Sequence, residues 1–456
     1  MRLKQERESA CACPDNVHGV LGGNGRNCQG GRAAMAKESF RFIHASDFHL
    51  ERPMQDVLDL PDHLRRTLVD APWKAAAAVF EHAAVENVDF IVLSGDLLNP
   101  VSTGAQGISF LLDHFQDMNA RGIQVYWAGG AADDPDRWPD AVHLPANVHV
   151  FSKRQVEQVV YRRNSHPLVT LLGRSSDGAE TIRAAEYTHE PDDNYCIAVA
   201  YGQADTETLT TERVDYWALG GDHRPQTLAA QQPCIRYCGS PQSRAMTEDG
   251  AHGFVLVDID AQRNMQTHQI EVDLIRNTIQ EIDAEDLALG RDLRQLLARR
   301  VARIQSEAAG RHVLVRWRVH MDLENAAVVG PSALEDLLGW LRREFGHGSP
   351  ACWSTDIEVL PPKQLPKKWQ DEDTILGDFL RVAASHRKNS AKELNLKSLV
   401  DTETPGSGHW ATVLLPTDPA SQLAMLERST LLGVDMLRGH QIDMLAPTRR
   451  FGGMDK

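Results

Sequence analysis

The stretch Phe42-Ile-His-Ala-Ser-Asp47-Phe-His49 decides the fold, because an apolar, β-prone run ends there on two polar side chains. Asp47 and His49 are two residues apart, a spacing at which both can face one ion. A second apolar run, Phe90-Ile-Val-Leu-Ser-Gly95-Asp96, also ends on an aspartate, after a glycine that permits a tight turn. Ligands of open α/β sheets gather at the carboxyl ends of strands, so we expect these side chains to converge.

Length and composition restrict the class of protein. A chain of 456 residues is too long for one ordinary core, so we expect two or three domains. No apolar run approaches the ~20 residues that a membrane-spanning helix needs. The net charge of −15 means that contact with DNA would need local basic patches or a basic partner. Seven cysteines without a secretory signal predict a cytoplasmic protein with free thiols.

The chain divides into four predicted segments. Residues 1–38 are polar and glycine-rich, and we expect them to be disordered, with Met35 as an alternative start. Residues 39–275 alternate strand and helix at first and are nearly all strand later, which predicts a layered α/β sandwich with helices outside the sheets. Residues 276–362 predict a small α+β capping domain. Residues 363–456 predict a C-terminal helical region.

Apolar periodicity predicts the individual elements. Helices are expected at Asp62–Val85, Ile108–Arg121, Ala284–Ala308, Pro331–Phe345, Asp373–Lys388 and Ser421–Arg438. After the first two apolar runs, strands are expected at Ile123–Ala128, Leu168–Leu172, Tyr195–Tyr201, Tyr216–Leu219, Ile235–Cys238, Gly253–Asp260, Met265–Val272, Arg311–His320 and Asp356–Leu360.

Four segments in this order resemble the calcineurin-like metallophosphoesterase superfamily: Asp47-Phe-His49, Gly95-Asp96, Gly220-Gly-Asp-His223 and Tyr237-Cys-Gly-Ser-Pro241. Within it, the likeness is to SbcD-type DNA repair exonucleases and their YhaO-like relatives. The resemblance implies a four-layer αββα sandwich. It also implies two metal ions that clamp a phosphodiester while a bridging hydroxide attacks phosphorus.

The chain departs from the family's ordered signature of DxH, GD, GNHD, a lone His and GHxH. Only the first two motifs are intact. Gly129-Gly130-Ala131-Ala132 stands where GNHD would be, and Tyr201 stands where the lone histidine would end its strand. The last motif reads Gly220-Gly221-Asp222-His223 and keeps only its second histidine.

The resemblance therefore implies one complete metal site and one lost site. The residues that match the ligands of the first site are all present: Asp47, His49, Asp96 and His223. The second site keeps only the shared aspartate, because Gly130, Tyr201 and Gly221 stand at its other positions. Ala131 replaces the catalytic histidine. We expect one bound divalent cation, with Mn²⁺ as the first choice for a carboxylate and imidazole set.

Two nearby carboxylates offer an alternative to the loss of the second site. Asp133 and Asp222 each lie a few positions from a lost ligand and could replace it. The competing interpretation is that Asp133 initiates a turn and that Asp222 is a solvated loop residue.

Two functions remain open on these grounds. The first is a metal-dependent phosphodiesterase with weak activity that resembles the nuclease subunit of a DNA repair exonuclease. The resemblance implies DNA as its substrate and an SbcC-like coiled-coil ATPase as its partner, bound through the C-terminal region. The second is a catalytically inactive phosphoesterase-fold scaffold or nucleic-acid adaptor. The apolar surface of the last predicted helix fits either a partner or packing within the chain.

Overall fold

The computed structural model describes residues 38–52, 54, 57, 59–190, 193–284, 291–321, 331–360, 365, 367–388 and 419–437. The prediction of disorder before Glu38, with its alternative start at Met35, lies outside the described residues.

The first sheet has six strands in the order β12-β11-β1-β2-β3-β4. The bounds are β1 (Phe40–Ala45), β2 (Phe90–Leu93), β3 (Gln124–Trp127), β4 (Val148–Val150), β11 (Gly253–Ile259) and β12 (Met265–Glu271). Strands β1 to β4 run parallel, and β11 is antiparallel to both of its neighbours. The parallel pairing of β1 with β2 brings the two polar segments that follow them to the same edge.

The second sheet also has six strands, in the order β5-β6-β7-β8-β10-β9. The bounds are β5 (Glu157–Arg163), β6 (His166–Gly173), β7 (Tyr195–Tyr201), β8 (Tyr216–Gly220), β9 (Gln226–Ala229) and β10 (Cys234–Tyr237). Strands β6, β7, β8 and β10 are parallel, whereas the edge strands β5 and β9 are antiparallel to their neighbours. The ends of β7 and β8 therefore lie at one edge of this sheet.

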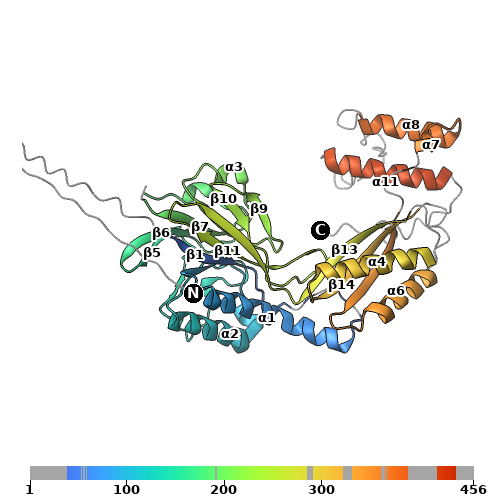
Figure 1. Ribbon diagram of the computed structural model, residues 1–456. Helices are drawn as coiled ribbons and strands as arrows, with labels where there is room; N and C mark the ends of the chain where they lie inside the picture. The colour runs from blue at the N-terminus through green and yellow to red at the C-terminus, as the bar shows by residue number, and fades with distance from the viewer. Residues whose placement is uncertain are drawn as a thin grey trace, which may run out of the picture. The chain divides into compact units, whose positions relative to one another are not determined.

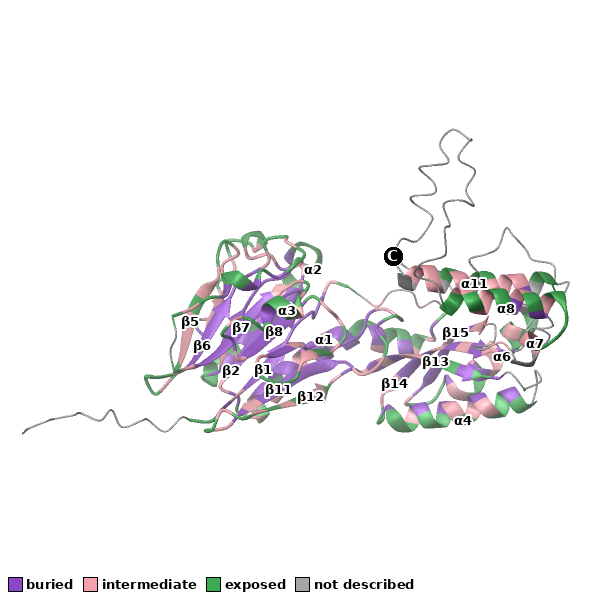
Figure 2. Cartoon of the chain, turned by 90° about the horizontal axis from the view of Figure 1, so that it is seen from above, coloured by how far each residue is buried: buried purple, intermediate pink, exposed green. Residues whose placement is uncertain are grey.

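The two sheets pack face to face, and two long helices cover the outer face of the first sheet (Figure 1). The core between the sheets contains Phe42 and Phe90 from the first and Ile197 and Tyr216 from the second. The helices α1 (Asp62–Val85) and α2 (Pro100–Ala120) cover the first sheet. The outer face of the second sheet is covered by short segments that include η2 (Ala184–Glu186) and α3 (Thr206–Leu209). Most residues of the central strands are buried (Figure 2). The predicted mixed α/β class is confirmed.

A smaller unit of three strands follows. Its bounds are β13 (Ile275–Asp283), α4 (Arg291–Glu307), β14 (His312–His320), α6 (Pro331–Phe345) and β15 (Cys352–Leu360). All strand pairs are parallel, in the order β13-β14-β15, so this unit is a βαβαβ arrangement rather than a segregated α+β one. Side chains of α4, α6 and one face of β14 share a core that includes Leu297, Trp317 and Leu341.

The described C-terminal residues form α7 (Lys367–Gln370), α8 (Ile375–Lys388) and α11 (Pro419–Leu437). Leu380 of α8 and Val434 of α11 are buried in one small cluster with Trp369 and Phe379. This contact favours packing within the chain for at least part of the apolar surface of the last helix. Other apolar side chains stay exposed, such as Ile375 (76%) and Met436 (63%).

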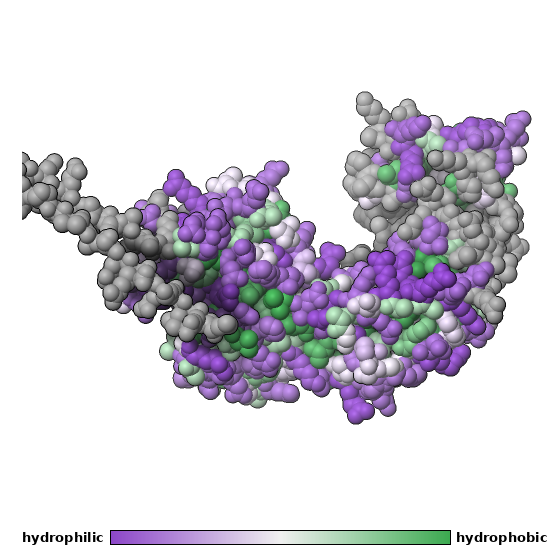
Figure 3. All heavy atoms as spheres, in the orientation of Figure 1, coloured by the Kyte–Doolittle hydropathy of each residue, from purple (hydrophilic) through white to green (hydrophobic). Residues whose placement is uncertain are grey.

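Most of the predicted elements are present within a few residues of their expected bounds. The helix predicted at Ile108–Arg121 is the second half of α2, which begins at Pro100 after an Asn99 cap and is interrupted by the left-handed Gly104. The sequence patterns missed β4, β5, β9 and β13. Within the described part of the chain no helix is long and apolar enough to cross a membrane, and the described surface in Figure 3 is largely hydrophilic.

Candidate metal centre

The segments after β1 and β2 run side by side beyond the sheet. The backbone amide of Asp47 donates to the carbonyl of Gly95 at 2.9 Å, and the amide of His49 donates to the carbonyl of Asp96 at 3.0 Å. Asp47, His49 and Asp96 all have left-handed backbones, with φ of 57°, 41° and 56°. Such backbone strain in non-glycine residues tends to gather at functional sites, where the surrounding structure holds it in place.

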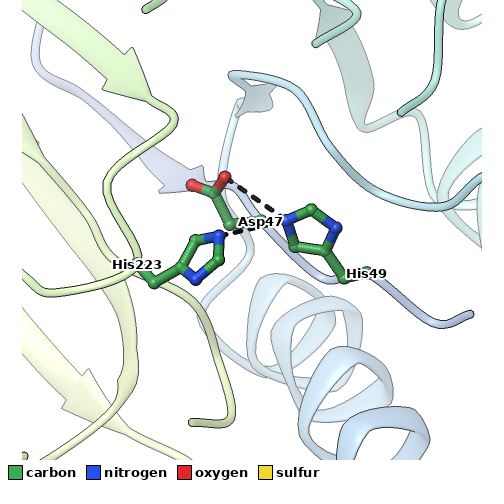
Figure 4. Close-up of side chains that lie close together, drawn as sticks. All are labelled: Asp47, His49 and His223. Atoms are coloured by element: carbon green, nitrogen blue, oxygen red, sulfur yellow. Dashed lines mark hydrogen bonds and ion pairs between the residues drawn. The ribbon is translucent and has the colours of Figure 1, made fainter. Parts of the chain in front are cut away.

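Three predicted ligands face one another at this edge (Figure 4). Ligand atoms of Asp47, His49 and His223 all lie within 4.8 Å of one another. Nε2 of His49 is 3.2 Å from Nε2 of His223, 3.9 Å from Oδ1 of Asp47 and 3.4 Å from Oδ2 of Asp96. The structure thus brings Asp47, His49 and His223 together from loops of two different sheets, and Asp96 adjoins this group through its contact with His49.

Both imidazoles are oriented by carboxylates. Nδ1 of His49 lies 3.2 Å from Oε1 of Glu51, and Nδ1 of His223 lies 2.6 Å from Oε1 of Glu248. A carboxylate accepts the proton of Nδ1, so the lone pair of each ring is left on Nε2. Sequence reasoning assigned no site role to Glu51 or Glu248. The available signal for Glu51 was its position two residues after His49.

The two Nε2 atoms point at each other at 3.2 Å, and two lone pairs at that distance repel unless a proton or a cation lies between them. Ligands held at ~2.0–2.2 Å from one ion are separated by roughly 3 Å. The donor set of two imidazoles and a carboxylate suits a divalent transition metal. The residues present therefore fit a cation.

The carboxylate of Asp47 is buried and held from several sides. The hydroxyl of Ser46 donates to its Oδ2 at 2.5 Å, and the amide of Gly221 donates to Oδ2 at 3.1 Å. Burial raises the pKa of Asp47 above its ordinary value, although His223 and His49 oppose that shift. Burial favours a higher pKa for Glu248, but the hydrogen bond and charge of His223 together with the amide and charge of Arg244 lower that pKa to about 2.

The side chain of Tyr201 lies directly beside Asp96. Its hydroxyl donates to Oδ2 of Asp96 at 2.6 Å, and the amide of Ala132 donates to Oδ1 at 2.6 Å. A Cβ on Gly95 or on Gly130 would come within 2.7 Å of the Tyr201 ring. The ring thus packs into room that exists only because small residues stand around it.

The contacts of Asp133 favour a structural role over that of a substitute ligand. Its buried carboxylate accepts four hydrogen bonds, two at each oxygen, from the amides of Asp96, Gly130 and Leu97 and from the indole of Trp127. Burial and the nearby charge of Asp96 raise the pKa of Asp133 well above its ordinary value, against the opposing effect of these amides. The carboxylate fixes the loop after β3 against the loop after β2. The turn itself begins at Asp134, whose side chain caps η1 (Pro135–Arg137).

Asp222 is not part of the group formed by Asp47, His49 and His223, and its role as a substitute ligand stays a prediction. Its Oδ1 accepts a hydrogen bond of 3.0 Å from the amide of Arg224, which is a local turn contact. The side chain is 33% exposed and borders an open cleft of about 1010 Å³. This agrees with the interpretation of Asp222 as a loop residue.

That cleft lies against the metal centre. His223, Tyr201 and Glu248 line its inner side, and Tyr237 and Arg224 line other parts of it. Among its described lining residues, Arg224 is the only lysine or arginine, whereas Glu180, Asp222 and Glu248 are acidic. The cleft is therefore not a basic groove.

Comparison with known proteins agrees with this geometry. Residues 40–225 match the model of the family described as calcineurin-like phosphoesterase. This segment is therefore similar to calcineurin-like phosphoesterases over about two fifths of the chain. It contains all four residues of the candidate metal centre but ends before Glu248.

One relative and one solved structure extend the comparison. The chain is 28% identical over 232 residues to the uncharacterized metallophosphoesterase YhaO of Bacillus subtilis (strain 168). The matched region covers 48% of this chain and 57% of that protein. The match thus spans little more than half of the relative's length. The crystal structure of TT1561 of Thermus thermophilus is 12% identical and covers 51% of this chain and 99% of that one, with a TM-score of 0.32.

Proposed function

We propose that this protein binds one divalent cation and uses its phosphoesterase fold to hold a phosphodiester, with little or no hydrolysis. The observation that carries the proposal is the position of Tyr201. Its ring occupies the room beside Asp96, and its hydroxyl bonds to the oxygen that a second ion would need.

The single cation would be held by Asp47, His49 and His223, with Asp96 at the edge of the site. We take Mn²⁺ as the first candidate because the set combines carboxylate and imidazole donors. A cation bound there would polarise a phosphoryl oxygen and lower the pKa of a bound water. Glu51 and Glu248 orient the two imidazoles, and Tyr201 excludes a second ion.

Weak hydrolysis follows from what the site lacks. Ala131 offers no proton for a leaving oxygen at the position where the resembled family has a histidine. Loss of one group that stabilises the transition state typically costs ~10² or more in rate. The loss of both the second ion and this histidine therefore leaves binding as the better supported role.

The proposal is tested by measuring Mn²⁺ binding and hydrolysis on the same preparation. Elemental analysis and calorimetry are expected to give one ion per chain, lost in His223→Ala. Hydrolysis of bis(p-nitrophenyl) phosphate and of DNA with Mn²⁺ is expected to match that of Asp96→Asn. Two ions per chain, or turnover that disappears in Asp96→Asn, would overturn it.

A second candidate function is the slow, metal-dependent phosphodiesterase of the DNA exonuclease type. It is favoured by the intact ligand set and by the open cleft of about 1010 Å³ beside His223, which has room for a nucleotide. The same assay decides between the two, because only this candidate predicts release of nucleotides from DNA that depends on Asp96.

The partners belong to the proposal as well. DNA is the proposed ligand and an SbcC-like coiled-coil ATPase the proposed partner, supported by the exposed apolar residues Ile375 and Met436 of the C-terminal helices. A cytoplasmic location is supported by the buried thiols of Cys234, Cys238 and Cys352, which form no disulfide.

A further inference from the structure

The segment between β10 and β11 is unusually polar for a buried loop. The side chains of Gln242, Ser243, Arg244 and Glu248 in this segment are almost fully buried. Charged residues are rarely buried unless they are paired and hydrogen-bonded. The hydrogen-bond partners of these side chains therefore indicate what the segment does. Some partners belong to the metal centre, and others belong to β13 and the residue before it.

The first group of partners belongs to the metal centre. The guanidinium of Arg244 donates to the carbonyl of Asp47 at 3.0 Å and to that of Phe48 at 2.8 Å. One carboxylate oxygen of Glu248 accepts the amide of Arg244 at 2.6 Å, and the other contacts Nδ1 of His223 at 2.6 Å. Arg244 and Glu248 together thus join the loop after β1 to the loop after β8, and each loop carries a ligand.

The second group of partners belongs to β13 and the residue before it. The side-chain amide of Gln242 donates to the carbonyl of Ile275 at 2.6 Å, and its Oε1 accepts the backbone amide of Leu274 at 2.9 Å. The side chain of Asn277 donates to Oγ of Ser243 at 3.0 Å, and the backbone carbonyl of Asn277 accepts the amide of Gly250 at 3.0 Å. The segment is therefore bonded to the first strand of the three-stranded sheet at several points.

We propose that Arg244 and Glu248 are positioning residues for the cation site and that residues 242–248 couple this site to β13. The inference rests on the proposed single cation. Glu248 keeps the Nε2 lone pair of His223 directed at the ion, and Arg244 keeps the left-handed turn at Asp47 in place. Because β13 is bonded to the same segment, an ion that fixes the ligands also orders that strand.

The chemistry of each residue makes specific demands. Removal of the carboxylate that holds a ligating histidine typically weakens metal binding by ~10–100-fold. The planar fork of arginine can reach two carbonyls at once, which the single ammonium of lysine does not reproduce. Burial lowers the pKa of Arg244, and the negative charge of Glu248 opposes this. The charged form of Arg244 is therefore stabilised by Glu248.

Calorimetry with Mn²⁺ on the full chain tests the proposal in Glu248→Gln and Arg244→Lys. Glu86→Gln is the matched control, because Glu86 is a partly exposed carboxylate paired with Arg41 far from the loops concerned. We expect ~10–100-fold weaker binding in Glu248→Gln, weaker binding in Arg244→Lys, and no change in the control. Binding in both variants equal to that of the unmodified chain would overturn the positioning role. If the unmodified chain binds no Mn²⁺, the proposed function itself fails.

Two further readouts separate positioning from mere support of the fold. The visible spectrum of bound Co²⁺ is expected to change in Glu248→Gln, since the orientation of a ligating ring changes. Hydrogen exchange of the unmodified chain is expected to slow in β13 and in residues 242–250 when Mn²⁺ is added. Unchanged exchange in β13 with Mn²⁺ bound would overturn the coupling, and this experiment needs no variant to fold.

Discussion

The hydroxyl of Tyr201 donates to Oδ2 of Asp96 at 2.6 Å, and the same oxygen lies 3.4 Å from Nε2 of His49. A single carboxylate oxygen is thus shared between the metal centre and the tyrosine that fills the space next to it. The hydroxyl of Tyr201 and a bound cation would both use the lone pairs of Oδ2 of Asp96. Under the proposed function, residue 201 should therefore affect how strongly the cation is bound.

Tyr201→Phe is expected to strengthen Mn²⁺ binding severalfold, because Oδ2 of Asp96 then accepts no hydrogen bond from residue 201 and is available to the ion. The metal-free protein is expected to lose ~1.5–3 kcal/mol of unfolding free energy, the range for a hydrogen bond to a charged group. Calorimetry and urea denaturation measure the two quantities. Tyr237→Phe is the control, since that hydroxyl lines the same cleft but donates to the carbonyl of Gly202. An equal change in affinity in both variants would contradict the prediction.

Gly130→Ala is expected to destabilise the fold by ~1–3 kcal/mol, the usual cost of overpacking. The added Cβ would lie 2.4 Å from Oδ1 of Asp96 and 2.7 Å from its amide nitrogen. The chosen control, Gly339→Ala, lies within α6 and meets only the end of a flexible arginine at 3.2 Å, so it should stabilise by ~0.5–1 kcal/mol. Thermal unfolding of the two variants should shift in opposite directions, and shifts of the same sign would show that the loop at Gly130 has room to move.

Asp133→Asn is expected to cost ~2–4 kcal/mol of unfolding free energy, because an amide NH₂ would then face N–H donors that the carboxylate now accepts. The number of bound ions should stay unchanged, since this carboxylate binds backbone and indole groups only. Asp222→Asn, a partly exposed loop residue, should change stability by less than ~0.5 kcal/mol. Loss of a bound ion in Asp133→Asn would restore the idea of a substitute ligand.

The sequence predicted the convergence of Asp47, His49 and Asp96 because their meeting rests on a general property of parallel strands, whereas His223 was assigned from the resemblance alone. Asp47, His49 and Asp96 follow β1 and β2, which are neighbours, and His223 follows β8 of the facing sheet. What surrounds the ligands was not predictable in the same way. Arg244 lies 197 positions after the Asp47 carbonyl it holds, and such a contact has no local pattern.

Asp133 shows the opposite case, in which the local pattern misled. An Asp-Asp-Pro run is typical of a turn, and the turn does begin at Asp134. The preceding aspartate instead turns inward and is fully buried. The edge strands β5 and β9 escaped prediction because they are mostly exposed or half-buried, so their apolar periodicity is weak.

Leu380→Ala tests whether the C-terminal helices pack on each other rather than only on a partner. Leu380 is 2% exposed and shares its cluster with Val434 of α11, so its truncation should remove ~2–5 kcal/mol of local stability. Hydrogen exchange in both α8 and α11 should then accelerate in the isolated chain. Val382→Ala, on the same helix but 56% exposed, should leave exchange in α11 unchanged. If Leu380→Ala alters only α8, the two helices are not one cooperative unit, and the apolar face of α11 would be left for a partner to cover.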